Sequence, residues 1–282
     1  MSACTSSEPL LGADGMPSQI DISGYADVRA ELDVEAETIR YPIDAFFLAP
    51  EQLATVAHAN DLLWDACMEE GGRSYPPAAF DMSASLHRQD TYYGIWSPDR
   101  AARLGYSFDA SAAEAADAAA QAMMAADQDD SGWGPAFDAC VETVERLPLI
   151  GRDIALDEDQ EVFDLPQAVR DDAKMLASRS PRWDEARAEW SDCLTAKGLL
   201  LQEDETSPWA PEVPEDPEAA IRTAVLDVQC KEETGLVETL SSLEAQYQAA
   251  LIDQNRAALD EVAEKEQEIM ERAEKILAEN GR

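Results

Sequence analysis

Two helical segments of this sequence end in the same way, and this repeat constrains the fold more than any other feature. Trp64 is followed three residues later by Cys67, and Trp190 is followed three residues later by Cys193. A spacing of three places both side chains on one face of a helix. A glycine follows each cysteine within five residues, as is usual where a helix stops. The chain therefore contains two related helix ends.

Each of these helices precedes an irregular stretch with proline and then a further helical segment with one cysteine, Cys140 or Cys230. We predict two half-related helix-loop-helix units, each closed by its own disulfide, Cys67–Cys140 and Cys193–Cys230. The paired cysteines lie 73 and 37 positions apart, and loops of these lengths stabilise a fold by roughly 4 kcal/mol each on the chain-entropy model. Sequence alone leaves the crossed pairings open.

Free buried thiols and a metal site are the alternatives to two disulfides. No C-x-x-C motif occurs, the cysteines are widely spaced, and only His58 and His87 are available as histidine ligands. We therefore expect no metal site at the cysteines and no cofactor. An even number of cysteines besides Cys4 is typical of proteins from an oxidising compartment.

The first residues resemble the end of a bacterial lipobox, because Ser2-Ala3 precede Cys4. Met1 stands where a lipobox normally has leucine, so we infer a removed signal peptide or a misassigned start codon. We predict that Cys4 carries the lipid, that residues 1–20 form a flexible tether, and that the lipid holds the protein at the outer face of the cell membrane. An ordinary N-terminal cysteine in a cytosolic protein is the alternative.

Apolar residues recur at helical spacing through most of the chain, so we predict an all-α fold. The expected helices are 50–70, 109–126, 135–147, 166–178, 181–197 and 217–279. We expect the tether at 1–20, a first helical unit with an aromatic loop at 21–165, a second helical unit at 166–234, and a long C-terminal helix at 235–282.

Two features near the C-terminus favour extended elements. The prolines at 208, 211, 214 and 217 recur every third residue, which predicts a polyproline II strut. The apolar stripe that follows Gly235 is too long for a core of this size to cover. Its distal end is therefore expected to project or to pair with another helix as a coiled coil.

The net charge of −38 comes from 59 acidic and 21 basic residues. Binding a polyanion requires Lys and Arg side chains that displace counterions. This charge argues against nucleic acid and against anionic membrane surfaces as partners, and leaves the lipid as the predicted contact with the membrane.

The irregular stretch that follows the helix expected at 50–70 is rich in aromatic residues, including Tyr92, Tyr93, Trp96 and Tyr106. Such rings, with arginines nearby, can form a platform for a sugar or a peptide. The alternative is a long loop that folds on its own aromatic core.

A weak match to a calcium loop follows, with oxygen ligands Asp127, Asp129 and Ser131 at positions one, three and five and Asp138 at position twelve. A glycine stands at position eight and a proline at position nine, and aspartate is too short at position twelve for easy bidentate binding. We therefore expect a plain turn and no calcium.

Several short motifs together resemble a group of exported actinobacterial lipoproteins: Cys67-Met68-x-x-x-Gly72, Tyr93-Gly94-Ile95, Leu104-Gly105-Tyr106, Trp190-x-x-Cys193, Asp227-x-x-Cys230-Lys231 and Thr234-Gly235-Leu236-Val237. The resemblance covers residues 40–280 and departs at Gly72-Arg73, where an aromatic residue is usual. It implies an accessory role in the cell envelope, next to ABC exporters or peptidoglycan-binding proteins. No catalytic residue is carried over.

The function predicted from these features is that of a lipid-anchored binding or structural protein of the actinobacterial cell envelope, accessory to an envelope ABC exporter. The alternative is a protein that binds peptidoglycan or a small ligand through residues 92–108. The sequence has no G-x-S-x-G, no H-E-x-x-H and no phosphate-binding glycine loop, so we do not predict an enzyme.

Overall fold

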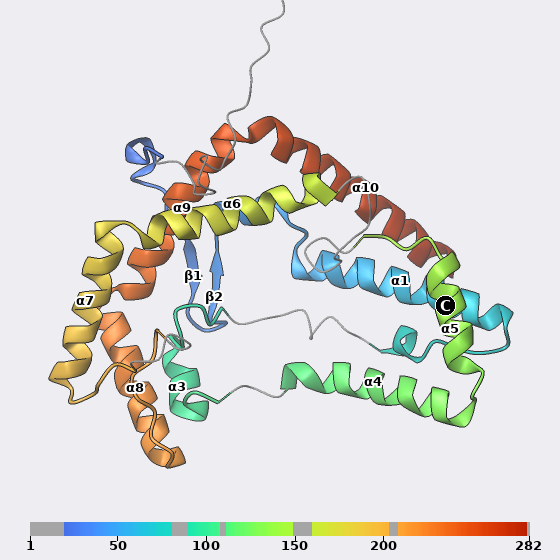
Figure 1. Cartoon of the computed structure of the whole chain (residues 1–282), viewed down its shortest axis with the longest axis horizontal. Helices are drawn as coiled ribbons and strands as arrows, with labels where there is room; N and C mark the ends of the chain where they lie inside the picture. Colours follow the sequence, from blue (N-terminus) through green and yellow to red (C-terminus); the bar gives the residue numbers. More distant parts are fainter. Residues whose placement is uncertain (1–19, 81–89, 108–110, 149–159, 203–207, 281–282) are drawn as a thin grey trace, which may run out of the picture. The chain divides into compact units, whose positions relative to one another are not determined.

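The computed structural model describes residues 20–80, 90–107, 111–148, 160–202 and 208–280. The predicted all-α fold is confirmed, because 70% of the structure is helical. The helices are α1 (Pro50–Glu70), α3 (Pro98–Leu104), α4 (Ser111–Asp129), α5 (Trp133–Thr143), α6 (Gln160–Ser178), α7 (Pro181–Ala196), α8 (Pro217–Thr234), α9 (Leu236–Gln254) and α10 (Arg256–Asn280), as Figure 1 shows.

A small antiparallel hairpin precedes α1. Its strands are β1 (Glu31–Asp33) and β2 (Thr38–Arg40), with Leu32 opposite Ile39. Short 3-10 helices occupy Ser23–Tyr25, Pro42–Phe46 and Pro76–Ala79. This hairpin was not predicted from the sequence, because each strand has only three residues.

The chain folds into two compact units that interleave along the sequence. Unit 1 comprises Met1–Ile43, Thr91–Gly105 and Gln167–Arg256, and unit 2 comprises Asp44–Asp90, Tyr106–Pro166 and Ala257–Arg282. The expected sequential division at 21–165, 166–234 and 235–282 does not match these units. The reason is that Tyr93 packs in unit 1 with the tryptophans of α7 and with Trp209, which are far from it in the sequence.

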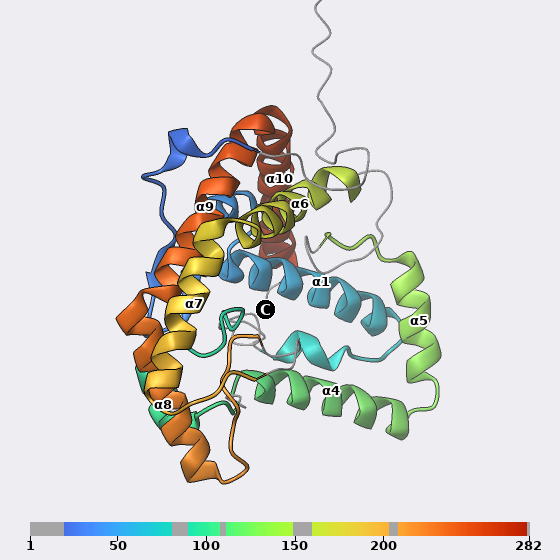
Figure 2. The same ribbon diagram turned by 60° about the vertical axis from the view of Figure 1, so that its left-hand side comes forward.

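Unit 1 is built around α7, which contacts both α8 and α9, while α3 packs against α8. Figures 1 and 2, two views that differ by a 60° turn, show α7 alongside α8 and α9. The core holds five buried aromatic side chains from three segments: Tyr93 and Trp96 before α3, Trp183 and Trp190 of α7, and Trp209 before α8. Aromatic rings supply large apolar area, so this cluster contributes strongly to the hydrophobic stabilisation of unit 1.

Unit 2 has two hydrophobic clusters. One joins α1 to α10 through Val56, Ala59, Ile269 and Ala273, and the other surrounds Trp133 of α5. The end of α10 therefore packs within unit 2 rather than projecting.

Two polar contacts fix loops of unit 2. The buried Asn60 amide pairs with both backbone groups of Leu147, donating to its carbonyl at 2.9 Å and accepting from its N–H at 2.7 Å. Arg73, which follows α1, donates to Asp130 Oδ2 at 2.7 Å. This ion pair joins the segment after α1 to the turn between α4 and α5.

Helix starts follow the cap and proline signals of the sequence. The side chains of Ser97, Ser180 and Asp216 accept hydrogen bonds from the first turns of α3, α7 and α8, and a proline follows each. The start expected at Pro166 is wrong, because α6 begins at Gln160 and Pro166 lies inside the helix. The helix expected from Pro135 begins at Trp133.

The long helix expected over 217–279 is interrupted twice. Gly235 takes a left-handed conformation with φ of 62° and ends α8. Asn255 ends α9 with its backbone N–H bonded to the carbonyls of Leu251 and Ile252. The apolar stripe is thus divided among three helices, and Leu240 and Leu243 of α9 pack in the core of unit 1 while Ile269 of α10 packs in unit 2.

The polyproline strut is also not a free-standing element. Pro211 pairs with Leu201 in an antiparallel bridge, and Glu212 N–H donates to the carbonyl of Leu200 at 2.8 Å. Trp209 between the prolines is 6% exposed and belongs to the core of unit 1. Burial of the Trp209 ring holds the proline-containing segment against the core of unit 1.

Both predicted disulfides are present. Cys67 bonds to Cys140 in unit 2 with a Cα–Cα distance of 6.0 Å, and Cys193 bonds to Cys230 in unit 1 with a distance of 5.6 Å. Trp64 and Trp190 each share a hydrophobic cluster with the cysteines of their unit. Two disulfides indicate an oxidising, extracytoplasmic environment.

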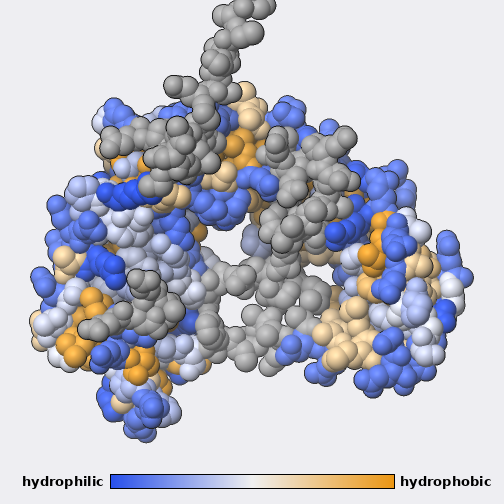
Figure 3. Space-filling model, viewed as in Figure 1, coloured by the Kyte–Doolittle hydropathy of each residue, from blue (hydrophilic) through white to orange (hydrophobic). Residues whose placement is uncertain are grey.

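None of the described helices combines the length and the apolar content needed to cross a membrane. The described surface is mostly hydrophilic in the view of Figure 3, with separate hydrophobic areas, as expected for a net charge of −38.

Candidate ligand-binding pocket

Unit 1 contains a pocket of about 220 Å³ whose walls come from three separate parts of the chain. Leu32 and Val34 line it from the β1–β2 hairpin, and Trp96 lines it from the segment before α3. The junction of α8 and α9 supplies the remaining wall. Convergence of distant segments on one concave site is typical of ligand sites.

The hairpin is joined to the Trp96 segment by the buried carboxylate of Glu37. Its Oε1 accepts from the backbone N–H groups of Trp96 at 2.7 Å and Ser97 at 3.1 Å, and its Oε2 pairs with Arg100 at 2.6 Å. Glu37 is 1% exposed and Arg100 is 3% exposed. Breaking such a pair leaves an uncompensated buried charge, so it holds these two walls together.

Lys231 of α8 joins the third wall to the same segment. Its Nζ donates to the carbonyls of Ile95 at 2.8 Å and Trp209 at 3.0 Å, and to Asp227 Oδ2 at 3.1 Å. These bonds use all three donors of the ammonium group. Burial lowers the pKa of Lys231, while the negative charge of Asp227 acts in the opposite direction.

Close packing around the Lys231 amine requires a glycine at position 94. Gly94 has φ of 72°, and a Cβ there would lie 2.6 Å from the Trp209 carbonyl oxygen and 2.9 Å from Lys231 Nζ. Both the left-handed backbone and the lack of space exclude a side chain. This geometry accounts for the glycine of the Tyr93-Gly94-Ile95 motif.

The turn at Gly235 brings two acidic side chains to the pocket. Glu232 precedes the turn, Glu238 follows it, and Val237 between them supplies apolar surface. Both carboxylates are exposed. In the part of the chain that the structure describes, neither has a hydrogen bond or an ion pair, whereas the charge of Lys231 is balanced by Asp227.

The four residues of the predicted aromatic platform do not form an open surface. Tyr93 is 0% and Trp96 is 4% exposed, while Tyr92 is 39% exposed. Tyr106 belongs to unit 2. Trp96 nevertheless contributes to the pocket wall, so one of the four is at a candidate binding site.

Tyr92 and Tyr93 have different surroundings. The Tyr93 hydroxyl donates to the buried Glu244 carboxylate, and burial raises its pKa well above the usual value. Lys174 Nζ lies 3.0 Å from the centre of the Tyr92 ring, a cation–π contact. Burial, with the negative charge of Glu244, raises the pKa of Tyr92 to about 12.

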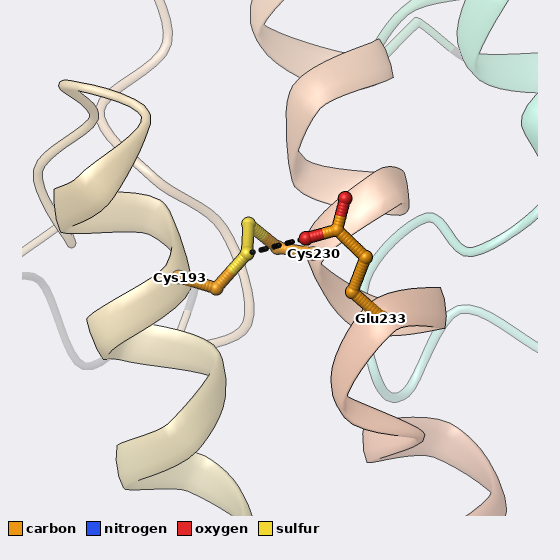
Figure 4. Close-up of side chains that lie close together, drawn as sticks. All are labelled: Cys193, Cys230 and Glu233. Atoms are coloured by element: carbon orange, nitrogen blue, oxygen red, sulfur yellow. Dashed lines mark hydrogen bonds between the residues drawn. A yellow bond between two sulfur atoms is a disulfide. The ribbon is translucent and has the colours of Figure 1, made fainter.

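A second cluster surrounds the disulfide of unit 1 (Figure 4). Glu233 Oε2 lies 3.5 Å from Cys193 Sγ, and Glu233 Oε1 pairs with Lys197 Nζ at 2.8 Å. A disulfide sulfur carries no hydrogen, and neither does an ionised carboxylate, so the sulfur–oxygen contact is not a hydrogen bond. Cys193, Cys230 and Glu233 have the spacing of metal ligands, but sulfurs bonded to each other are not thiolates, which are the form that binds metal.

The residues of the predicted calcium loop are divided between two helices. Asp127 and Asp129 lie at the end of α4 and Asp138 lies inside α5, with Ser131 in the turn between them. Among the described residues, the three carboxylates do not come together within ligand distance of one another. The turn is instead organised by Asp130, which accepts from Gly132 N–H at 2.8 Å.

Most of the pocket was not anticipated from the sequence. Asp227 and Lys231 appeared only in the short motifs of the resemblance, Gly235 only there and as the start of the long apolar stripe, and Glu37, Glu232 and Glu238 were not singled out. One signal was available: Asp227 and Lys231 lie four residues apart on a helical face that also carries Cys230. A charged pair beside a core cysteine indicates a buried ion pair.

Comparisons with protein-family models, with curated proteins and with solved structures found no match. The predicted lipid site, Cys4, lies outside the described residues.

Proposed function

We propose that this protein is a binding protein of the cell envelope, held at the outer face of the membrane by a lipid on Cys4, and that the unit 1 pocket is its binding site. The observation that carries the proposal is the way the pocket is built. Glu37 and Lys231 each connect pocket walls through buried, charge-assisted hydrogen bonds. Fixing a site before the ligand arrives lowers the entropic cost of binding.

Binding rather than catalysis is proposed because Lys231, the one basic group among the described residues that line the pocket, already donates all its hydrogen bonds. Lys231 is 2% exposed and donates all three of its hydrogen bonds inside unit 1. The exposed groups at the pocket are carboxylates and apolar side chains. The accessory role beside an ABC exporter, and peptidoglycan as the ligand, remain predictions from the family resemblance, and a pocket of this kind is compatible with either.

The proposal is tested by placing a photo-crosslinking amino acid at Val34, which lines the pocket and is 45% exposed. The matched control is the same amino acid at Leu200, which belongs to unit 1, is 63% exposed and does not line the pocket. The protein is irradiated in intact cells, purified and analysed by intact-mass spectrometry.

An adduct of defined mass at position 34, absent at position 200, is expected. Equal labelling at the two positions, or none at position 34, contradicts a binding site in this pocket. In the same spectra, Cys4 is expected to carry a diacylglyceryl group, and an unmodified N-terminus at Met1 would contradict the anchor.

A further inference from the structure

The apolar part of the pocket limits the size of its ligand. Leu32, Val34, Trp96 and Val237 provide the hydrophobic wall. A volume of about 220 Å³ corresponds to roughly seven water molecules at ~30 Å³ each. This space accommodates one group the size of a single side chain. The 45% exposure of Val34 leaves apolar surface that such a group would cover.

The charged part of the pocket determines the sign of its ligand. Glu232 and Glu238 are exposed and have no described partner, while the Lys231 charge is paired with Asp227. The carbonyl end of α8 and the amide end of α9 meet at Gly235, so their opposite helix dipoles largely cancel. The two carboxylates, in a chain of net charge −38, therefore give the pocket a negative potential.

A bare metal ion does not fit this arrangement. Ions such as Ca²⁺ require six to eight oxygen ligands, and the two carboxylates are not part of a described group of metal-ligand spacing. Much of the pocket wall is apolar, which offers a metal ion nothing. An organic cation uses both the carboxylates and the apolar wall.

We infer that the pocket binds an alkylammonium group, a short aliphatic chain that ends in a primary amine. The chain lies against Val34, Trp96 and Val237, and the ammonium group pairs with the exposed carboxylates of Glu232 and Glu238. This inference rests on the proposed function and adds the chemical class of the ligand. It applies equally to a free amine and to an amine-bearing side chain of a peptide.

The test compares three probes with the same six-carbon chain by isothermal titration calorimetry of the full chain at low ionic strength: hexylammonium chloride, hexanol and sodium hexanoate. We expect hexylammonium to bind most tightly, hexanol more weakly and hexanoate not at all. Added salt should weaken hexylammonium binding and leave hexanol binding unchanged, because screening acts only on the charged group.

Two variants separate the contributions of charge and apolar contact. Glu238→Gln should weaken hexylammonium binding about 1.5-fold to fivefold, the range of an exposed ion pair, without affecting hexanol. Glu189→Gln on α7 removes the same charge from an exposed position outside the pocket and should have no effect. Val34→Ser should weaken both hexylammonium and hexanol by roughly threefold to fivefold, through lost apolar contact.

The outcomes distinguish the inference from the proposed function. Hexanol or hexanoate binding as tightly as hexylammonium, or equal effects of Glu238→Gln and Glu189→Gln, would overturn the inferred charge and leave the pocket as a binding site. Absence of hexylammonium binding would overturn the inference, and the crosslinking at Val34 would then decide the proposed function independently.

Discussion

The buried charges beside the unit 1 pocket and the buried carboxylates of unit 2 have different surroundings. In unit 1, Lys231 pairs with Asp227 and Arg100 pairs with Glu37, and all four residues are at most 3% exposed. In unit 2, Glu266 of α10 is 7% exposed, and its Oε1 has no hydrogen-bond partner among the described residues. Burial raises the pKa of Glu266 to about 7 and that of Asp61 to about 6.

The difference shows what a buried charge can contribute to each unit. A paired charge joins segments that are distant in sequence, as Lys231 does with Ile95, 136 positions away. Glu266 accepts a backbone hydrogen bond from Leu48 but has no ion pair among the described residues, so its burial makes stability depend on pH near neutrality. The pocket lies where Glu37 and Lys231 of unit 1 are paired, and these pairs hold the segments of its walls together.

The largest expected effect comes from breaking a pair in unit 1. Lys231→Met leaves Asp227 as a buried charge and removes the donor from two carbonyls, so we expect a loss of about 3 to 5 kcal/mol of unfolding free energy. Chemical denaturation measures the loss. Lys275→Met, an exposed lysine of α10, is the control and should change stability by less than ~0.5 kcal/mol. A similar small change for Lys231→Met would contradict the role given to this pair.

Removing one disulfide tests whether the two units are stabilised separately. Replacing Cys193 and Cys230 with alanine should lower the unfolding free energy by about 4 kcal/mol, because the unfolded chain regains the conformational entropy that the disulfide removes. Hydrogen exchange with mass spectrometry should show faster exchange in α7 and α8 and little change in α1 and α5. The corresponding change at Cys67 and Cys140 should give the reverse pattern. Equal loosening of both units by either change would refute separate stabilisation.

Glu266→Gln tests how a buried carboxylate of unit 2 makes folding stability depend on pH. The folded-state pKa of about 7 exceeds the unfolded value, so ionisation of Glu266 costs stability progressively as the pH rises from about 4.5 through 7. At pH 8 the substitution should stabilise the protein by roughly 2 kcal/mol, allowing for partial solvent access, and at pH 4 it should have little effect. Thermal melts at both pH values measure this. Glu268→Gln, exposed on the same helix, should show no such difference, and an equal shift for both variants would argue against a raised pKa at Glu266.

Calcium should have the smallest effect. The carboxylates of Asp127, Asp129 and Asp138 do not converge, so millimolar calcium should leave the melting temperature of the protein unchanged. A large increase that Asp127→Ala abolishes would show that the turn rearranges into a calcium site.

Local signals in the sequence predicted much of the fold. The repeat of tryptophan and cysteine at helical spacing led to both disulfide pairings, and Pro181 and Pro217 marked the starts of α7 and α8. These features depend on residues close together in the chain, or on a repeat. The interleaving of the units is different, because it depends on which distant segments bury the rings of Tyr93 and Trp209 together.

The pocket was harder to predict for the same reason. Its walls meet only because Glu37 reaches Arg100 and Lys231 reaches Ile95. In a chain with 59 acidic residues, no pattern distinguishes one buried glutamate from the exposed ones. The predicted aromatic platform shows the same limit. Its residues could have formed an exposed surface, but Tyr93 and Trp96 lie in the core of unit 1.

The most direct test of a pocket prearranged by buried charges is amide hydrogen exchange in the ligand-free protein, read by NMR at Trp96 and Ser97. Both N–H groups donate to the buried Glu37 carboxylate, although neither lies in a helix interior or a strand. We expect these two amides to exchange as slowly as amides in the middle of α8. Exchange as fast as that of an exposed loop would show that the pocket walls are not held together before a ligand binds.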